Sequence, residues 1–359
     1  MIAFSPPVSA FSRKLIAWHA HAGRHDLPWQ QQPSPYRIWV SEIMLQQTRV
    51  PTVLHYYPRF VERFADLASL AAASEREVLS LWSGLGYYAR ARNLHACARH
   101  LCQHHGGEFP RRAAMLATLP GIGRSTAAAI AAFAFGERAA ILDGNVKRIL
   151  CRCFAIEGFP GEKTTEQRLW QLAESLLPAP KDATHAVMAT YTQAQMDLGA
   201  TLCTRTRPDC SRCPLADDCR ARADDRVQEL PAPRPKKTTP LRHAALALVR
   251  DMDGRILLLQ RPATGIWGGL YSLPECQCLP AALARTLPAH AAARLQHAFT
   301  HFRLTLEVFA LMLPQTAPLS LRGADGHAPQ HWLAPEELAN APLPAPIRRI
   351  LATLVTANR

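Results

Sequence analysis

The chain has 359 residues, enough for two domains that each bury a core, which excludes a small disulfide-stapled scaffold. Hydrophobic residues make up 48% of it, but the longest apolar run, residues 127–135, is too short to span a bilayer. The net charge of +13 predicts a polyanionic partner, with nucleic acid as the first candidate, because lysines and arginines that neutralise phosphates release counterions.

The first part of the chain has a helical pattern. Between Ser12 and about Ala200 the apolar residues recur at spacings of three and four, which predicts many short helices. We therefore expect an all-α domain over residues 1–225. Glycine and proline mark the expected breaks between helices, at Pro58 and at residues 84–86, 106–107, 120–123 and 178–180.

A proline-rich stretch separates this part from the rest. Prolines and basic residues alternate between residues 230 and 240, a composition that stays extended and buries no core. We expect residues 226–240 to be an interdomain linker, followed by a mixed α and β domain over residues 241–359. In that domain, short apolar runs between turns predict strands at residues 244–249, 256–259 and 304–311.

Four of the ten cysteines, Cys203, Cys210, Cys213 and Cys219, have the spacing C-x6-C-x2-C-x5-C. Thiolates at this spacing form a metal cage, and both tetrahedral zinc and a cubane iron–sulfur cluster bind four cysteines, so the spacing leaves both open. The N-terminal residues lack a secretory signal, so we expect a cytoplasmic protein with reduced or metal-bound thiols. We interpret the other six as core or incidental thiols, namely Cys97, Cys102, Cys151, Cys153, Cys276 and Cys278.

A glycine turn forms the second pattern. Residues 119–123, with the sequence LPGIG, precede Arg124, Ser125 and an alanine-rich helical run. Glycine lets the backbone approach a ligand, and the start of a helix presents free N–H groups, so this turn can bind phosphate. An ordinary helix-to-helix turn has the same composition.

Two carboxylates are candidates for acid–base chemistry. Glu42 stands among apolar residues, and burial would raise its pKa enough for it to donate a proton near neutral pH. Asp143 stands where a helix should begin. The structural alternatives are a helix-start glutamate for Glu42 and an N-cap for Asp143. The sequence does not show whether residues so far apart in the chain share a site.

A second glycine loop carries aromatic and basic residues. Residues 84–93, with the sequence GLGYYARARN, place two tyrosines beside Arg90 and Arg92. Such side chains suit stacking on bases and pairing with phosphates. The alternative is a helix cap followed by a solvated charged face.

In this order, the patterns resemble the helix-hairpin-helix DNA glycosylase superfamily and, within it, the adenine DNA glycosylases of the MutY family. The resemblance is close over residues 12–222 and looser after them. It implies an all-α helix-hairpin-helix glycosylase domain with a 4Fe-4S cluster on the four-cysteine loop, in preference to zinc, and a phosphate-binding hairpin. The matching strings lie at residues 27–29 (LPW), 41–48 (SEIMLQQT), 84–93, 119–126, 142–148 (LDGNVKR) and 196–200 (MDLGA).

The resemblance also implies a base-excision reaction on double-stranded DNA. An adenine mispaired with 8-oxoguanine or guanine would be flipped out by a monomer, and its N-glycosidic bond hydrolysed. Glu42 would protonate N7 of the adenine. Asp143 would stay ionised and stabilise the sugar cation, either electrostatically or through a transient covalent adduct.

Ser125 stands where related glycosylase-lyases carry a lysine that forms a Schiff base with the sugar. A serine hydroxyl cannot form that imine, so the resemblance implies a monofunctional glycosylase. Two alternatives stay open. One is an oxidised-pyrimidine glycosylase-lyase of the endonuclease III type, and the other is a non-enzymatic DNA-binding iron–sulfur protein.

The remaining residues take roles only by matching family positions. Trp29 and Gln193 would line the adenine pocket, with Ser41 nearby. The alternative for Trp29 is an ordinary core position. The DNA-contacting set would be Gln47, Leu85 and Tyr87 near the lesion pair, and Leu119, Gly121, Gly123, Arg124 and Ser125 in the hairpin.

The C-terminal half is similar to the family's 8-oxoguanine-reading domain, which has a Nudix-like α+β fold. The similarity rests on residues 267–274 (WGGLYSLP) and on Phe299, Thr300 and His301. Residues 241–359 contain no Arg-Glu-x-x-Glu-Glu string of the kind that holds the metal of a Nudix hydrolase. We therefore expect recognition of the base rather than pyrophosphatase activity.

Overall fold

A computed structural model describes residues 8–235, 239–262, 264–299, 301–313, 321 and 329–356. The chain divides into two compact units. The first comprises residues 1–71 and 96–236, and the second comprises residues 72–95 and 237–359. The second unit thus combines a helical segment of the N-terminal half with the C-terminal half.

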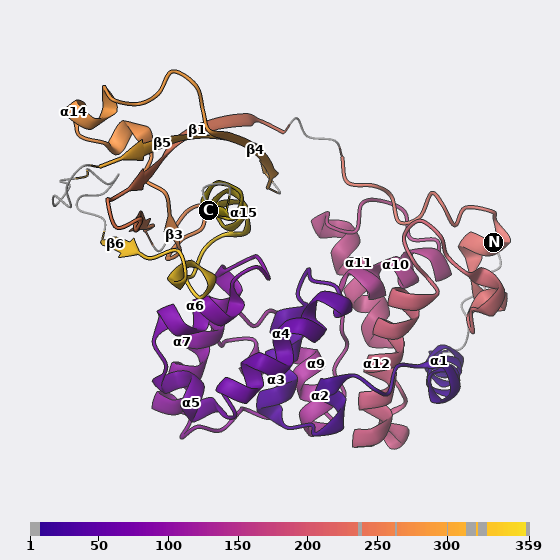
Figure 1. Ribbon diagram of the computed structural model, residues 1–359. Coiled ribbons are helices and arrows are strands. Elements are labelled where there is room, and N and C mark those ends of the chain that lie inside the picture. Colours follow the sequence, from indigo (N-terminus) through magenta and orange to yellow (C-terminus); the bar gives the residue numbers. More distant parts are fainter. Residues whose placement is uncertain are drawn as a thin grey trace. The chain divides into compact units, whose positions relative to one another are not determined.

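The first unit is helical (Figure 1), as the periodicity predicts. Short elements connect its main helices, namely α2 (Pro28–Gln31), α5 (Leu67–Ala72), α8 (Ala113–Leu116), η1 (Pro180–Asp182), η2 (Cys210–Arg212), η3 (Ala216–Asp218) and α13 (Arg220–Ala223). The main helices are α1 (Val8–Ala22), α3 (Pro35–Leu45), α4 (Val50–Arg63), the second half of α7 (Ala89–His104), α9 (Arg124–Phe135), α10 (Gly144–Cys153), α11 (Lys163–Ser175) and α12 (His185–Thr201).

Local chemistry sets where these helices begin and end. The Ser34 hydroxyl accepts a hydrogen bond from the Arg37 N–H at 3.2 Å and caps α3, and the Thr184 hydroxyl caps α12 in the same way. Gly136 ends α9 in the left-handed region, with φ of 70°.

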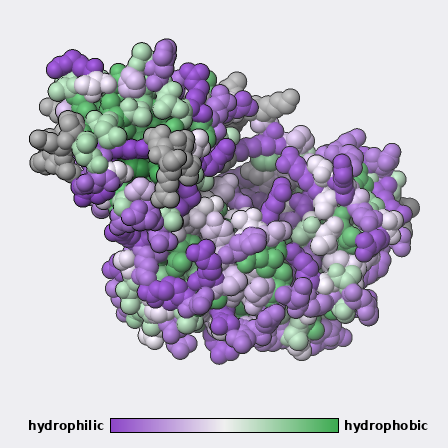
Figure 2. Space-filling model, in the orientation of Figure 1, coloured by the Kyte–Doolittle hydropathy of each residue, from purple (hydrophilic) through white to green (hydrophobic). Residues whose placement is uncertain are grey.

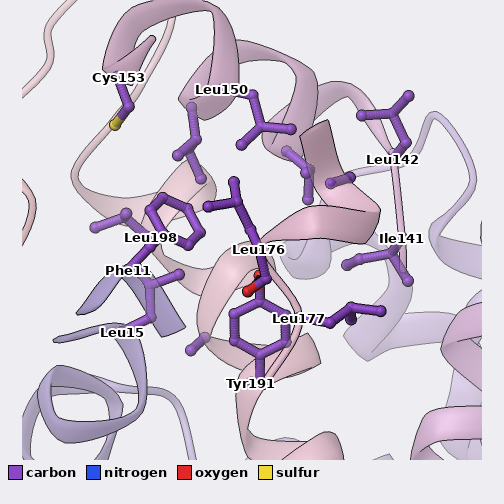
Figure 3. Packing of buried hydrophobic residues seen from close by; sticks show 14 of the residues in the cluster. Phe11, Leu15, Ile141, Leu142, Leu150, Cys153, Leu176, Leu177, Tyr191 and Leu198 are labelled. Atoms are coloured by element: carbon purple, nitrogen blue, oxygen red, sulfur yellow. Dashed lines mark hydrogen bonds between the residues drawn. The ribbon is translucent and has the colours of Figure 1, made fainter. Parts of the chain in front are cut away.

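A leucine-rich core holds α1, α9, α10, α11 and α12 together (Figure 3). Phe11 and Leu15 of α1 meet Leu150 of α10 and Leu198 of α12 in this cluster. The buried Tyr191 hydroxyl donates a hydrogen bond to the Leu176 carbonyl at 3.1 Å, so this polar group of the core is satisfied. The core thereby fixes α10, which begins after Asp143, and α12, which carries Gln193 and ends just before Cys203.

The C-terminal part of the second unit is a mixed sheet with strand order β3-β2-β1-β5-β4, in which β6 also pairs with β2. β1 and β5 run parallel and the other pairs are antiparallel. The three predicted strands are confirmed as parts of β1, β2 and β5. The strands are β1 (Leu241–Arg250), β2 (Ile256–Gln260), β3 (Tyr271–Ser272), β4 (Ala293–Ala298), β5 (Arg303–Met312) and β6 (Gln330–Leu333).

Alternation along the strands gives this sheet a core on each face. Leu246 and Leu248 of β1 face one cluster, which includes Ile347 of α15 (Ala345–Thr356). Ala247 and Val249 face the other, against which α14 (Ala281–Ala284) packs. The α+β expectation is confirmed. The remaining elements of this unit are α6 (Glu75–Trp82), the start of α7, η4 (Cys276–Cys278) and η5 (Glu337–Ala339).

The surface carries many hydrophilic residues (Figure 2). Figure 2 shows hydrophilic side chains over much of the visible surface, with apolar groups exposed among them. Within the described parts of the chain, no helix has the length and apolar character needed to cross a membrane.

One expected break is wrong. Pro58 lies inside α4 rather than at its end, although proline removes a backbone donor. Val53, Tyr57 and Phe60 of α4 are buried, while Pro58 is exposed on the opposite face. Burial of the apolar face therefore offsets the lost hydrogen bond, and the helix continues.

Pro58→Ala should stabilise the protein by about 1–2 kcal/mol. Alanine restores the N–H, and the gain of up to about 3 kcal/mol in helix propensity is reduced by the greater freedom of the unfolded chain. Urea unfolding measures the change. Pro51→Ala, at the start of the same helix where proline is tolerated, serves as the matched control and should give no gain. Equal stability of wild type and Pro58→Ala would contradict this account.

Candidate active site and cysteine cage

Glu42 lies on α3 among residues that pack into the core. Its neighbours Ser41, Ile43 and Met44 are buried, whereas Glu42 keeps part of its surface accessible to solvent. The pKa of Glu42 is raised to about 8. Burial of the carboxyl is the main cause, and the negative charge of Asp143 is the second. Glu42 therefore holds a proton at neutral pH.

The structure brings Asp143 close enough for its charge to act on Glu42. Asp143 is the N-cap of α10, and its carboxylate accepts hydrogen bonds from the Val146 N–H at 2.8 Å and from the Asn145 side-chain amide at 3.1 Å. Burial raises the pKa of Asp143, and these donors together with the charge of Arg148 oppose the rise. The donors stabilise the ionised form, so we place the shared proton on Glu42.

The start of helix α9 is hydrogen-bonded to the chain segments that carry the two carboxyl groups. Near its start, the Ser125 hydroxyl accepts a hydrogen bond from the N–H of Leu142, the residue before Asp143, at 2.9 Å. The Thr126 hydroxyl accepts one from the side-chain amide of Gln46, just after α3, at 3.2 Å. The first turn of α9 thus holds the segments that carry Glu42 and Asp143.

Arg148 links Asp143 to the cysteine loop. Its guanidinium donates to the Asn145 side-chain oxygen at 2.8 Å, to the Gly199 carbonyl at 2.7 Å and to the Cys203 carbonyl at 2.6 Å. Asn145 in turn donates to Asp143. Sequence reasoning assigned no role to Asn145 or Arg148, although both lie in the family-like string at residues 142–148.

The four predicted cysteine ligands line one cavity, beside Leu198 and Leu202. Within the described residues, no three His, Cys, Asp or Glu side chains surround one position as ligands of a single metal ion would. Four thiols around one cavity are a donor set that a 4Fe-4S cluster accepts.

Two α10 residues that sequence reasoning did not place in the site complete this cavity. The buried Arg152 donates to the Cys203 sulfur at 3.4 Å and to the Thr204 carbonyl at 2.7 Å. Cys153, expected to be a core or incidental thiol, is buried in the leucine-rich core and also lines the same cavity, close to Cys219.

The hairpin before α9 has the geometry of an anion site in its backbone. Gly121 is in the left-handed region and Gly123 is the N-cap of α9, with both residues exposed. Leu119, by contrast, has a buried side chain. The guanidinium of Arg124 lies 3.8 Å from the centre of the Trp170 ring and pairs with Glu174. The Arg124 side chain is therefore engaged within the protein.

Two predicted DNA-contacting residues have strained backbones. Gln47 of the first unit is exposed, with φ of 55°. Tyr87 of the second unit has φ of 49°, and 52% of its side chain is exposed. Non-glycine residues in this region cluster at functional sites because the conformation costs free energy. Leu85 is buried.

The predicted pocket residues lie in well-packed surroundings. Trp29 is buried with its ring 5.5 Å from that of Tyr57, as in a core. Gln193 donates its amide N–H to Asp197 at 2.8 Å. Asp197 is fully buried and also accepts from Arg24 and contacts His19.

The predicted base-reading loop is described in part. The Phe299 ring stacks on Phe302 at 4.6 Å and lies 5.8 Å from the Trp267 ring. His301 is exposed. Thr300 lies outside the described residues.

Comparison with known proteins agrees with this architecture. The family profile "HhH-GPD superfamily base excision DNA repair protein" matches residues 40–175, and the NUDIX domain profile matches residues 245–353. The adenine DNA glycosylase of Rattus norvegicus is 34% identical over 96% of this chain and 77% of its own length. The chain belongs to the adenine DNA glycosylase family.

A second relative covers nearly the whole chain, and a solved structure covers part of it. The enzyme of Buchnera aphidicola (strain APS) is 32% identical over 95% of this chain and 96% of its own length. Among solved structures, a thermostable thymine-DNA glycosylase covers 61% of this chain and 97% of its own, with 27% identity and a TM-score of 0.52.

Gly199→Ala should destabilise the protein by about 1–3 kcal/mol, the usual cost of overpacking, because neighbouring atoms must move to make room. The change should also disturb the contact of α12 with Asn145. A Cβ at Gly199 would lie 2.4 Å from the Cβ of Asn145. Thermal or urea unfolding measures the loss. At Gly144 an added Cβ meets open space, so Gly144→Ala is the control and should not destabilise. Equal losses for the two variants would contradict this packing.

Proposed function

We propose that this adenine DNA glycosylase hydrolyses the N-glycosidic bond of adenine mispaired with 8-oxoguanine or guanine in double-stranded DNA, acting as a monomer on a flipped-out base. The observation that carries the proposal is the pair of neighbouring carboxyl groups in unequal surroundings. Glu42 has a pKa raised to about 8, while Asp143 accepts hydrogen bonds at the start of α10.

The two groups divide the work of bond cleavage. Glu42 donates its proton to N7 of the adenine, which makes the base a neutral leaving group as the C–N bond breaks. The negative charge of Asp143 stabilises the sugar cation that develops. Glu42, now ionised, accepts a proton from the water that attacks the sugar, and this restores the starting state.

The reaction ends at an abasic site. A lyase needs an amine at the sugar, and Ser125 offers a hydroxyl that already accepts a hydrogen bond from Leu142. Its role in this proposal is to hold the segment that carries Asp143. The endonuclease III-type alternative has no support from this position.

Both units bind the DNA in this proposal. The backbone of Gly121 and Gly123 and the free N–H groups of α9 receive a phosphate, and Gln47 and Tyr87 enter the duplex beside the mispair. Phe299, Thr300 and His301 contact the 8-oxoguanine. The net charge of +13 favours such a partner.

The cysteine cage holds a 4Fe-4S cluster through Cys203, Cys210, Cys213 and Cys219. When bound, the cluster supplies a rigid cross-link that closes the loop on itself. The chain's own residues connect this loop to α10 through Arg148 and Arg152.

A single-turnover assay on three duplexes tests the function, using protein whose iron and sulfide content shows a filled cage. The duplexes carry adenine opposite 8-oxoguanine, adenine opposite thymine, and thymine glycol opposite adenine. We expect strand cleavage of the first duplex alone, and only after alkali. Cleavage of the third without alkali would overturn the proposal in favour of a lyase, and no cleavage of any would leave a DNA-binding protein.

Glu42→Gln should reduce the excision rate by about 10²–10⁴-fold, the usual contribution of a general acid, while DNA binding is retained. The wild-type rate should fall as the pH rises through about 8, because Glu42 then loses its proton. It should also fall in acid as Asp143 becomes protonated. Rates against pH measure both limbs.

The exposed Glu62 on α4 provides the control, and Glu62→Gln should leave the profile unchanged. Excision at the wild-type rate by Glu42→Gln, or a rate that keeps rising above pH 8, would show that Glu42 is not the acid.

A further inference from the structure

Residues 72–95 form one compact unit with the C-terminal half. Ser83, which follows α6, accepts a hydrogen bond from Arg348 of α15 at 2.9 Å and donates one to the Leu343 carbonyl at 2.8 Å. Arg348 also donates to the Ala339 and Ala341 carbonyls. The base of the loop after α6 is therefore attached to the C-terminal half by directional contacts.

The exposed Tyr87 ring stands on this loop and is supported from inside. The Arg90 guanidinium lies 5.4 Å from the centres of both the Tyr87 and Trp82 rings. Arg90 and Trp82 both donate to the Gly86 carbonyl at 3.2 Å. Arg90 is buried, and burial lowers its pKa to about 10. Arg90 therefore stabilises the loop from within the protein and is not part of an exposed phosphate-binding surface.

Arg92 joins this loop to the turn at Gly268 in the C-terminal half. Its guanidinium donates to the Gly268 carbonyl at 2.5 Å, while its backbone N–H bonds the Tyr88 carbonyl at 3.2 Å. Gly268 follows Trp267, which has φ of 55° and whose ring lies 5.8 Å from Phe299. A displacement of Phe299 can therefore reach the loop that carries Tyr87 through the tilted ring contact with Trp267 and the hydrogen bond between Arg92 and Gly268.

We propose that Arg92 is a specificity-determining positioning residue, which aligns Tyr87 with the DNA according to how the loop around Phe299 is engaged. This inference rests on the proposed function and adds a route by which the base opposite the adenine controls excision. In this proposal Arg92 is not a catalytic residue, because its observed contact is to the Gly268 carbonyl. It acts through Tyr87.

Single-turnover rates on adenine:8-oxoguanine and adenine:guanine duplexes test this inference with the full-length protein. Arg92→Gln should reduce the ratio of the two rates about tenfold, within the usual range of coupling between sites. Arg92→Lys, which keeps a donor for the Gly268 carbonyl, should restore most of the ratio. The exposed Arg294, on β4, gives the charge-matched control, and Arg294→Gln should leave the ratio unchanged.

A double-mutant cycle with Tyr87→Ala identifies the route. If Arg92 acts through Tyr87, Arg92→Gln should have no further effect on the ratio once Tyr87 is alanine. An equal loss on both duplexes, or an Arg92→Gln effect that persists in the Tyr87→Ala background, would overturn the inference. If Arg92→Gln does not fold, Trp267→Leu replaces it, because this change removes the ring between Phe299 and Gly268. Trp267→Leu should likewise reduce the ratio of the two rates, and have no further effect in the Tyr87→Ala background.

The wild-type measurement separates the two proposals. A wild type that excises neither adenine contradicts the proposed function itself. A wild type that prefers 8-oxoguanine, with Arg92→Gln retaining the same preference, contradicts only the role of Arg92.

Discussion

The negative charge of Asp143, held at the N-terminus of α10, is the constraint on which the rest of the site depends. An ionised carboxylate in a buried place is unstable unless donors surround it, and here the Val146 N–H and the Asn145 amide supply them. Burial of the Glu42 carboxyl, together with the nearby charge of Asp143, raises the pKa of Glu42 to about 8. In the proposed reaction the two carboxyls therefore take different roles, with Glu42 as the acid and Asp143 as the group that stabilises the cation.

Helix α10 connects this charge to the cysteine cage. Its ten residues span about 15 Å, with Asp143 at one end and Arg152 and Cys153 at the other. Arg148, between them, bonds both Asn145 and the Cys203 carbonyl. Because the same helix packs in the leucine-rich core in Figure 3, we expect a cluster that closes the cysteine loop to orient the carboxylate as well.

Much of this was predictable from the sequence, because periodicity reports which face of a helix or strand is buried. The strands at 244–249 and 304–311 and the helix start at Asp143 follow from such local patterns. Pro58 was misjudged because tertiary burial of Tyr57 and Phe60 outweighs local propensity. Partners distant in the chain, such as Cys153 with Cys219 or Arg124 with Glu174, leave no periodic trace, so the fold was needed to find them.

The protonation of Glu42 beside an ionised Asp143 is the central claim, and infrared difference spectroscopy of the carboxyl stretch tests it most directly. The account predicts a protonated-carboxyl band at pH 7 that titrates near pH 8 and is absent from Glu42→Gln. A band that survives in Glu42→Gln and disappears in Asp143→Asn would place the proton on Asp143 and contradict the account.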